Sequence, residues 1–182
     1  GWLNYVNVPN LLGAVPVPYL LREESGYQID LDEIRSKITD RTRAIVIITP
    51  SNPTGGVLAE DVLKELAEIA VANDLMVISD EVYEKIIFDG REHFSLAQIE
   101  SIKDKVLVVN SLSKTYAMTG WRIGYVAAPA NISKLIGNYL SHCISSPCAI
   151  SQKAAAVALS GSQETVETMQ TVSYTHLRAH ET

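Results

Sequence analysis

Four short, almost wholly apolar runs place the strongest constraint on the fold of this 182-residue chain. They are Ala44–Thr49, Leu75–Ser79, Val106–Asn110 and Ile123–Ala127. The runs lack the alternation of apolar and polar residues that marks a strand with one wet face. Continuous Val and Ile runs of this length are typical of strands buried on both faces of a parallel sheet. The sequence therefore predicts a mostly parallel sheet built from buried strands.

Helical patterns separate these runs. Asp30 and Glu33 have the spacing of a capping box, which opens a helix. Apolar residues recur at helical spacing over Val62–Ile69, and Asn131 is placed to cap a further helix. Another helix is expected to begin near Gly161. Strands that alternate with helices predict an α/β fold, a three-layer helix/sheet/helix sandwich in one domain.

Composition excludes several classes of function. The chain has 15 Lys and Arg against 21 Asp and Glu, a net charge of −6, and no basic cluster for nucleic acid. Its longest uncharged stretch, residues 135–152, is too polar to cross a membrane. Cys143 and Cys148 form no disulfide framework and lack the spacing of metal ligands. We therefore expect no metal site, no nucleic-acid or membrane partner, and a cytoplasmic location.

The last eleven residues, 172–182, read VSYTHLRAHET. This string is similar to the conceptual translation of a transposase sequencing adaptor. It contains three β-branched residues, two His and a Tyr without a helical stripe, although the preceding helix could also simply continue. We therefore expect residues 172–182 to be an artefact and residues 1–171 to be part of a larger domain. The native chain is then a fragment that is open at both ends.

Polar residues follow each of the first three strands where it ends. The first strand leads into a Pro- and Gly-rich turn that contains Asn52, the second into Asp80–Tyr83, and the third into Ser111–Lys114, with Arg122 shortly after. In open α/β sheets, ligands bind beyond the carboxyl ends of the strands. Any one of these residues is more commonly just solvated. Together, a Lys and an Arg flanked by hydroxyl groups indicate a phosphate or carboxylate ligand.

These residues carry a family resemblance. Ser111–Gly124, SLSKTYAMTGWRIG, resembles the lysine signature of class I pyridoxal-phosphate aminotransferases. Asn52–Gly55 and Ser79–Tyr83 resemble the other two cofactor motifs of that family, in the expected order and spacing. The resemblance covers residues 1–169, and Ser141–Lys153 is most similar to the aspartate and aromatic aminotransferase branch. It implies the large coenzyme-binding domain of the fold-type-I pyridoxal-phosphate enzymes, here incomplete.

The resemblance implies roles around the reactive end of the coenzyme. Lys114 would hold pyridoxal 5′-phosphate as a Schiff base and then move protons. Asp80 would lie against the pyridine nitrogen and keep it protonated. Tyr83 and Asn52 would hydrogen-bond the 3′-oxygen of the ring. Tyr5 falls where some members of the family have a histidine behind the aspartate.

The resemblance also implies a phosphate site and a stacking partner. Arg122, Ser111 and Ser113 would bind the phosphate by charge-assisted hydrogen bonds. Trp2 would stack on the coenzyme ring, and a core tryptophan is the competing interpretation. The glycine-rich turn of the family's phosphate site is expected before Gly1. A small domain is expected beyond the interdomain helix that starts near residue 161.

The implied function is that of an amino-acid aminotransferase, which uses an L-amino acid and a 2-oxo acid as substrates. The resemblance also implies a homodimer in the full-length protein. Two alternatives share the scaffold: a carbon–sulfur lyase or an enzyme like aminocyclopropane-carboxylate synthase, and the ligand-sensing domain of a transcription regulator. The lyase and the synthase keep the same coenzyme residues as an aminotransferase, because these residues contact the coenzyme and not the substrate side chain. The isolated fragment is expected to be inactive.

Overall fold

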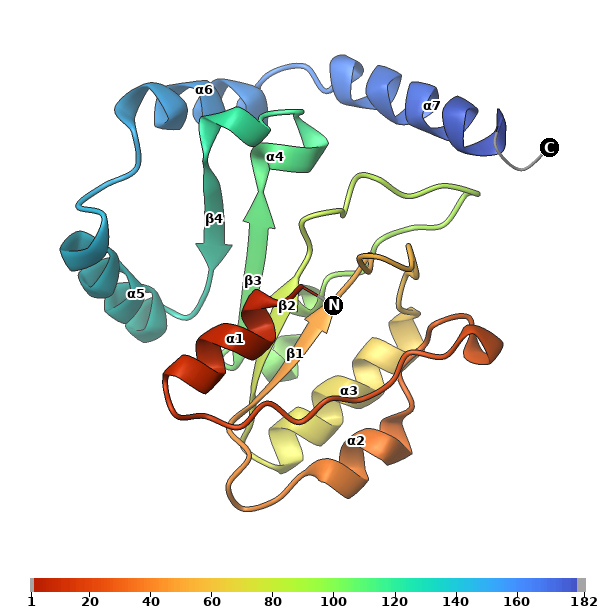
Figure 1. Cartoon of the computed structure of the whole chain (residues 1–182), viewed down its shortest axis with the longest axis vertical. Helices are drawn as coiled ribbons and strands as arrows, with labels where there is room; N and C mark the ends of the chain where they lie inside the picture. The colour runs from red at the N-terminus through yellow and green to blue at the C-terminus, as the bar shows by residue number, and fades with distance from the viewer. Residues whose placement is uncertain (1, 180–182) are drawn as a thin grey trace.

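A four-stranded sheet forms the centre of the computed structural model, which describes the backbone of residues 2–179 and the side chains of residues 2–175. The strands lie side by side in chain order (Figure 1): β1 (Ala44–Ile48), β2 (Met76–Asp80), β3 (Val106–Ser111) and β4 (Gly124–Ala127). β1, β2 and β3 are parallel, and β4 pairs with β3 in the antiparallel sense. The predicted α/β class and the mostly parallel sheet are confirmed.

The helices connect and flank these strands. Their bounds are α1 (Asn4–Leu11), α2 (Leu31–Lys37), α3 (Glu60–Ala72), α4 (Leu112–Thr115), α5 (Ala130–Cys143), α6 (Ala149–Ser160) and α7 (Glu164–Ala179). Short 3₁₀ turns lie at Glu23–Ser25, Leu96–Gln98, Glu100–Ile102 and Thr119–Trp121. Among the helices that the structure describes, none is both long and apolar enough to cross a membrane.

One face of the sheet carries the hydrophobic core. Alternate strand residues such as Ile47 and Val77 are fully buried there against α3, which contributes Leu63 and Leu66. The 3₁₀ turns at Leu96–Gln98 and Glu100–Ile102 close the same side. Burial of large aliphatic side chains supplies most of the stabilising free energy in such a layer.

The opposite face of the sheet is only half-buried. Val46 and Asp80 lie on it, and they alternate with the core residues of their strands. Tyr19 donates a hydrogen bond to the carbonyl of Val46 (2.9 Å), and Tyr5 of α1 reaches Asp80. Helix α1 therefore lies on this second face, which gives the third layer of the sandwich (Figure 1).

The helix-capping predictions had mixed outcomes. Asp30 is the N-cap of α2 and accepts hydrogen bonds from the backbone N–H groups of Asp32 and Glu33, as predicted. The reciprocal half of the capping box is absent, because the Glu33 carboxylate instead accepts from the Leu20 N–H and pairs with Lys37. Asn131 does not cap α5, because the helix already begins at Ala130 after Pro129.

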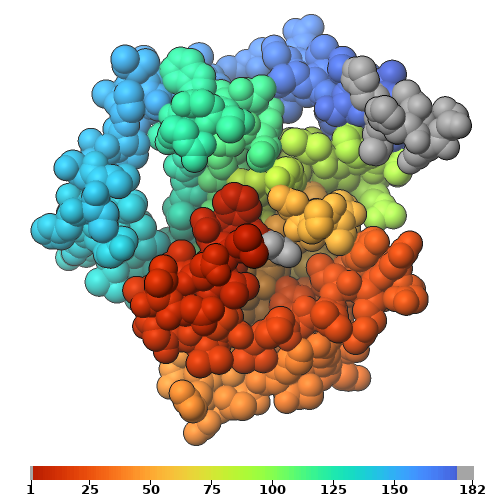
Figure 2. All heavy atoms as spheres, viewed as in Figure 1, coloured from red at the N-terminus to blue at the C-terminus, as the bar shows by residue number. Residues whose placement is uncertain are grey.

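The fourth run forms the strand β4, but its environment differs from the prediction. All four residues of β4 are exposed, so it is not a strand buried on both faces. It is an edge strand of the described sheet and pairs on one side only. Figure 2 shows an open gap between the α5 region and the body of the molecule beside this strand. An apolar run alone does not distinguish a central strand from an edge strand.

The segment 172–182 is helical as far as the structure describes it. α7 continues through Ala179, so the helix does absorb the residues that lack an apolar stripe. The Tyr174 ring stacks on Phe88 at a centroid distance of 5.3 Å, and its hydroxyl donates to Asp89. Conformation does not test the DNA origin of a segment, so the adaptor assignment stays a prediction. Residues 180–182 lie outside the described part.

The close approach of β4 to β3 leads to a stability prediction. A Cβ atom at Gly124 would lie 2.7 Å from the carbonyl oxygen of Asn110, whereas one at Gly120 would meet nothing within 4 Å. We expect Gly124→Ala to lower the free energy of unfolding of the full-length protein by about 1–3 kcal/mol. Urea unfolding measures this loss, and Gly120→Ala is the matched control. Equal effects of the two substitutions would contradict the tight β3–β4 contact.

Candidate functional site

The predicted site residues gather at the carboxyl edge of the parallel strands. Asp80 is the last residue of β2, and the strand register sets it opposite Ile48 of β1 and Val109 of β3. The turn after β2 carries Tyr83, and α4, directly after β3, carries Lys114. The structure therefore places these three residues at or beyond the carboxyl ends of β2 and β3, where ligands bind in open α/β sheets.

Asp80 is held from two sides. Its Oδ2 accepts a hydrogen bond from the Tyr5 hydroxyl (2.7 Å), and its Oδ1 accepts one from the backbone N–H of Val82 (3.3 Å). Its own carbonyl accepts from the Thr49 N–H (3.0 Å) in the ladder with β1. The carboxylate is thus fixed at the half-buried face, with acceptor capacity left for a further donor.

The Tyr5 phenol stays protonated over a wide pH range. Burial is the largest cause that raises its pKa above the ordinary value of 10.0, and the hydrogen bond to Asp80 and the negative charge of Asp80 add to it. A neutral phenol is a donor to a carboxylate and never repels it. The resemblance placed Tyr5 behind the aspartate, and in the structure the Tyr5 hydroxyl contacts Asp80.

Tyr83, Asn52 and Lys114 form a second group. The Asn52 side-chain amide donates to the Tyr83 hydroxyl over 3.3 Å, which links the loop after β1 to the turn after β2. The Lys114 ammonium lies 6.0 Å from the centre of the Tyr83 ring. Lys114 is exposed and makes no ion pair with any described residue. Asn52 and Lys114 therefore both lie near Tyr83 at the sheet edge.

The hydroxyl groups of Ser111 and Ser113 differ in their hydrogen bonds. The Ser111 hydroxyl caps α4 by accepting from the Ser113 N–H (3.1 Å), and it donates to the carbonyl of Ile123 (3.3 Å). The carbonyl of Ser113 accepts from the Thr119 hydroxyl. The side chain of Ser113 forms no hydrogen bond within the described residues. Of the two serines predicted to bind the phosphate, Ser113 therefore has the free hydroxyl group.

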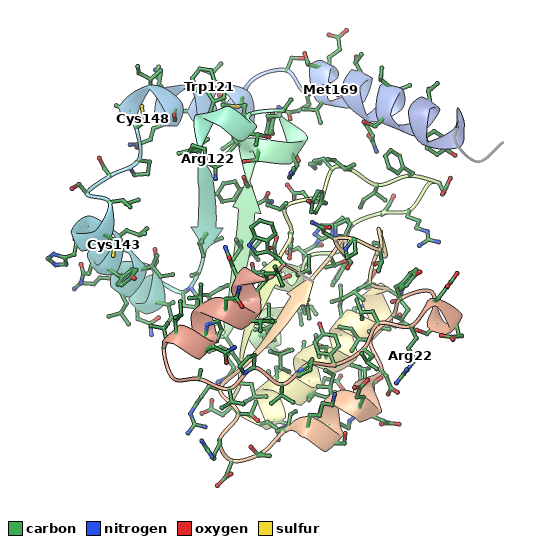
Figure 3. All side chains as sticks on the ribbon, viewed as in Figure 1. Arg22, Trp121, Arg122, Cys143, Cys148 and Met169 are labelled. Atoms are coloured by element: carbon green, nitrogen blue, oxygen red, sulfur yellow. The ribbon has the colours of Figure 1, made fainter. Side chains whose placement is uncertain are left out.

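Arg122 has an unusual backbone conformation. Its φ and ψ of 51° and 50° lie in the left-handed region, which costs a residue with a Cβ about 1–2 kcal/mol. Its guanidinium donates to the carbonyl of Thr119 (2.8 Å) and has no carboxylate partner in the described part of the chain. Figure 3 shows it next to Trp121, before β4. The surrounding structure must impose such a conformation, which a few other non-glycine residues of the described chain share.

Trp2 is the predicted site residue with the fewest contacts. Its indole is 55% exposed, and only its carbonyl is held, by the Tyr5 N–H at 3.1 Å. Trp2 lies one helical turn from the residue that contacts Asp80. A role in stacking stays a prediction.

The donor set of the site fits pyridoxal phosphate. A carboxylate at the strand end suits a protonated ring nitrogen, and the Asn52–Tyr83 pair suits a ring oxygen. An ammonium group and a guanidinium group, both without protein anions among the described residues, suit an aldehyde and a phosphate.

Sequence reasoning did not find the part played by Thr119, whose carbonyl holds Arg122, because a backbone acceptor leaves no signal in the residue type.

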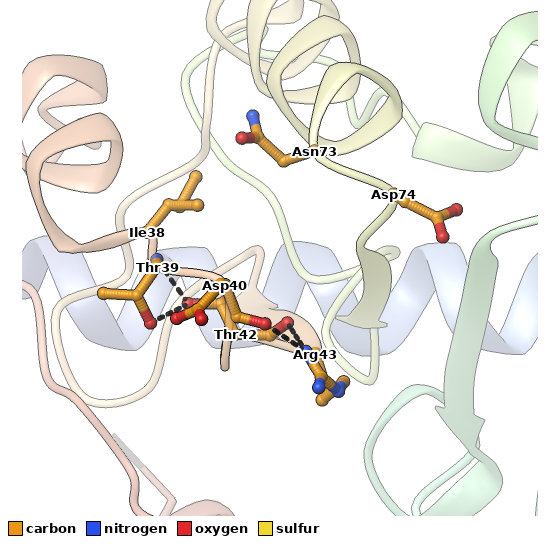
Figure 4. A pocket seen from close by; sticks show the side chains of 7 residues that line it. All are labelled: Ile38, Thr39, Asp40, Thr42, Arg43, Asn73 and Asp74. Atoms are coloured by element: carbon orange, nitrogen blue, oxygen red, sulfur yellow. Dashed lines mark hydrogen bonds between the residues drawn. The ribbon is translucent and has the colours of Figure 1, made fainter.

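A hollow in the described part of the chain lies away from this site. It encloses about 540 Å³ at the amino ends of the parallel strands, between the chain around Thr39–Arg43 and the end of α3 (Figure 4). Its arginine, Arg43, donates to the carbonyls of Asp40 and Thr42 at 2.8 Å each. Backbone carbonyls thus engage the cation, and the hollow faces away from the strand-end residues. The two cysteines are exposed, at the end of α5 and just before α6 (Figure 3), so they do not belong to the packed core.

Comparisons with known proteins agree with this arrangement. The family described as "Aminotransferase class I and II" matches residues 1–180. An aspartate aminotransferase from Bacillus sp. (strain YM-2) is 43% identical over 93% of this chain and 43% of its own length. Aromatic-amino-acid aminotransferase 2 of Thermococcus litoralis is 39% identical over 87% of this chain and 41% of its own length. The chain therefore spans less than half the length of these relatives.

Solved structures show the same fold. The aromatic aminotransferase from Pyrococcus horikoshii OT3 superposes with a TM-score of 0.91 at 39% identity, over 94% of this chain and 46% of its own. The aspartate aminotransferase from Thermus thermophilus with maleate gives a TM-score of 0.87 at 37% identity, over 94% of this chain and 44% of its own. At this identity the likeness extends beyond the fold to the sequence.

The contact between Tyr5 and Asp80 predicts a dependence of stability on pH. Because the folded-state pKa of Tyr5 lies above its ordinary value of 10.0, its contribution to stability is complete below about pH 10 and is lost as the pH rises further. We expect Tyr5→Phe to flatten the decline in unfolding free energy between about pH 10 and 12. Urea unfolding at several pH values measures this slope. An unchanged slope would show that Tyr5 is not held in its protonated form.

Proposed function

Because the chain belongs to the family of class I and II aminotransferases, we propose that its full-length protein transfers an amino group between an L-amino acid and a 2-oxo acid. Pyridoxal 5′-phosphate is the proposed coenzyme, bound at Lys114. One observation carries the proposal: an acid, a phenol–amide pair and two cations without protein anions meet at a single sheet edge.

Asp80 is proposed to bind the protonated pyridine nitrogen. Backbone hydrogen bonds hold the residue in a central strand, and the Tyr5 hydroxyl holds its carboxylate. Both the backbone and the side chain of Asp80 are therefore fixed in place. A carboxylate fixed in this way stabilises positive charge on the nitrogen without reorganising. When it is bound, the coenzyme supplies an electron sink for the carbanion formed at the substrate α-carbon.

Lys114 is proposed to bind the coenzyme covalently and to move protons at its Nζ atom. α4 places this atom on the Tyr83 side of the site, and no ion pair with a described residue competes for it. The Tyr83 hydroxyl and the Asn52 amide are proposed to orient the coenzyme through its 3′-oxygen. Because the hydroxyl accepts from Asn52, its own hydrogen is free to point to the ligand.

Arg122, Ser113 and Ser111 are proposed to bind the phosphate group. The left-handed backbone at Arg122 and its bond to Thr119 set the direction of the guanidinium before any ligand arrives. Preorganised donors bind more strongly, because less side-chain entropy is lost on binding. Trp2 is proposed to stack on the ring from the segment just before α1.

The finer features follow from the same proposal. The names of the relatives support aspartate or aromatic amino acids as candidate substrates. Exposed apolar side chains on α5 and the loop after it, among them Leu135, Tyr139 and Ile144, support a homodimer. Two free cysteines and the acidic composition support a cytoplasmic location.

The full-length protein, loaded with pyridoxal phosphate, tests the reaction class when single amino acids are added without any 2-oxo acid. Transamination predicts one equivalent of 2-oxo acid and conversion of the coenzyme to its pyridoxamine form. Repeated product release would instead indicate a lyase or synthase. A spectral change without product would indicate a ligand sensor, and either result would overturn the proposal.

Lys114→Ala tests the attachment site. Borohydride treatment of the loaded protein is expected to fix the coenzyme to Lys114, and peptide mapping locates the label. In the variant we expect no label at this peptide and a loss of turnover of at least about 10³-fold, because the covalent and proton-transfer roles are both removed. Lys153→Ala, in α6, is the control. A label that persists at one site in Lys114→Ala would refute the assignment.

A further inference from the structure

A buried carboxylate lies directly behind the candidate site. Glu81 follows Asp80 in the chain, and its side chain is only 2% exposed. Among the described residues it is the one ionisable residue in the buried class. Burying a carboxylate is costly unless its oxygens accept hydrogen bonds, so its presence calls for a compensating network.

The network uses three donor residues from two segments of the chain. The Ser79 hydroxyl of β2 donates to Glu81 Oε1 over 2.8 Å, and the Ser95 hydroxyl donates to the same oxygen over 2.9 Å. The His93 imidazole Nε2 lies 2.8 Å from Oε2. Because the carboxylate only accepts, this nitrogen carries the hydrogen. Both oxygens of Glu81 are thereby engaged.

The network joins the two ends of a long excursion of the chain. Glu81 is at its start, where the sheet ladder ends with the Glu81 N–H bonded to the carbonyl of Val109 (2.9 Å). Residues 82–85 then form turns, and the chain returns at His93 and at Ser95, which also caps the 3₁₀ turn Leu96–Gln98. The Glu81 carboxylate therefore ties the outgoing segment to the returning one.

Tyr83 lies within this tied segment. Its turn is closed by backbone hydrogen bonds from the Glu84 N–H to the Glu81 carbonyl (2.9 Å) and from the Ile86 N–H to the Tyr83 carbonyl (2.8 Å). Asp80, by contrast, is fixed on both sides by the parallel ladder and does not need the carboxylate of its neighbour. We therefore expect the Glu81 side chain to affect the position of Tyr83 more than the position of Asp80.

We propose that Glu81 is a positioning residue for Tyr83: its carboxylate, held by Ser79, Ser95 and His93, fixes the turn that presents the Tyr83 hydroxyl to the coenzyme. This inference rests on the coenzyme site of the proposed function. Candidate ligand atoms of Glu81, Glu84 and His93 also lie within 4.8 Å of one another. Hydrogen bonds already occupy both Glu81 oxygens, which favours the network over a cation site.

A double-mutant cycle in the full-length protein tests the inference, with the dissociation constant of pyridoxal phosphate as the readout. We expect Glu81→Gln and Tyr83→Phe each to weaken binding by about 3–10-fold, which is the loss of one hydrogen bond. We expect the dissociation constant of the double variant to lie within about twofold of that of the single variant that binds the coenzyme more weakly. The reason is that both substitutions remove the same contact. A merely structural role of Glu81 predicts that the two effects multiply.

Glu84→Gln is the matched control. This carboxylate lies on the same turn and accepts no hydrogen bond within the described part of the chain, so we expect an unchanged dissociation constant. Ser95→Ala replaces Glu81→Gln in the cycle if the latter fails to fold. Multiplying effects, or an equal loss in Glu84→Gln, would overturn the inference.

The readout separates this inference from the proposed function. Binding of the coenzyme needs no amino acid, so a protein that binds it and fails to transaminate contradicts the proposed function alone. If no coenzyme binds, the same cycle is measured on the free energy of unfolding of the coenzyme-free protein. A coupling of zero between the two substitutions would then overturn the inference about Glu81.

Discussion

The hydrogen-bond ladder on both sides of β2 is the constraint on which the rest of the site depends. The Asp80 carbonyl accepts from Thr49, and the next N–H, of Glu81, donates to Val109. These two bonds fix the last residue of β2 between two neighbours, at the edge where the backbone of parallel strands stops pairing. Apart from Ser111, which ends β3, the other candidate side chains lie in loops, turns or short helices near this edge. The strands therefore supply the rigid frame to which these residues are attached.

The sequence predicted the parallel strands well because a doubly buried strand leaves a continuous apolar run. It predicted β4 as a strand but not its exposure, because the same run is compatible with an edge. The Asp30 cap was readable, since capping is a contact between near neighbours. Asn131 failed as a cap because Ser, Asn and Asp are permitted caps and not obligatory ones, and the helix begins at Ala130 without a side-chain cap.

Residue types at strand ends located the site, and the family resemblance supplied the roles. Contacts between distant segments were beyond this reasoning. The Glu81 carboxylate joins residues 79, 93 and 95, and in the sequence its neighbour Asp80 is the more conspicuous acid. The spacing of apolar and polar residues does not show where a chain segment that leaves the sheet comes back to it. The strained backbone of Arg122 was equally invisible, because arginine is not a residue type that signals a left-handed conformation.

The pairing of Ser111 with Gly124 has a consequence for how such a site can change. The two residues lie opposite each other in adjacent strands, so the segment between them starts and ends at one point of the sheet. Lys114 and Arg122 both lie in that closed loop. Substitution or insertion at its tip therefore alters the reach of either cation and leaves the strands in register, since closing a slightly longer loop costs little. The loop that carries both cations can therefore vary while the pairing of Ser111 with Gly124 stays the same.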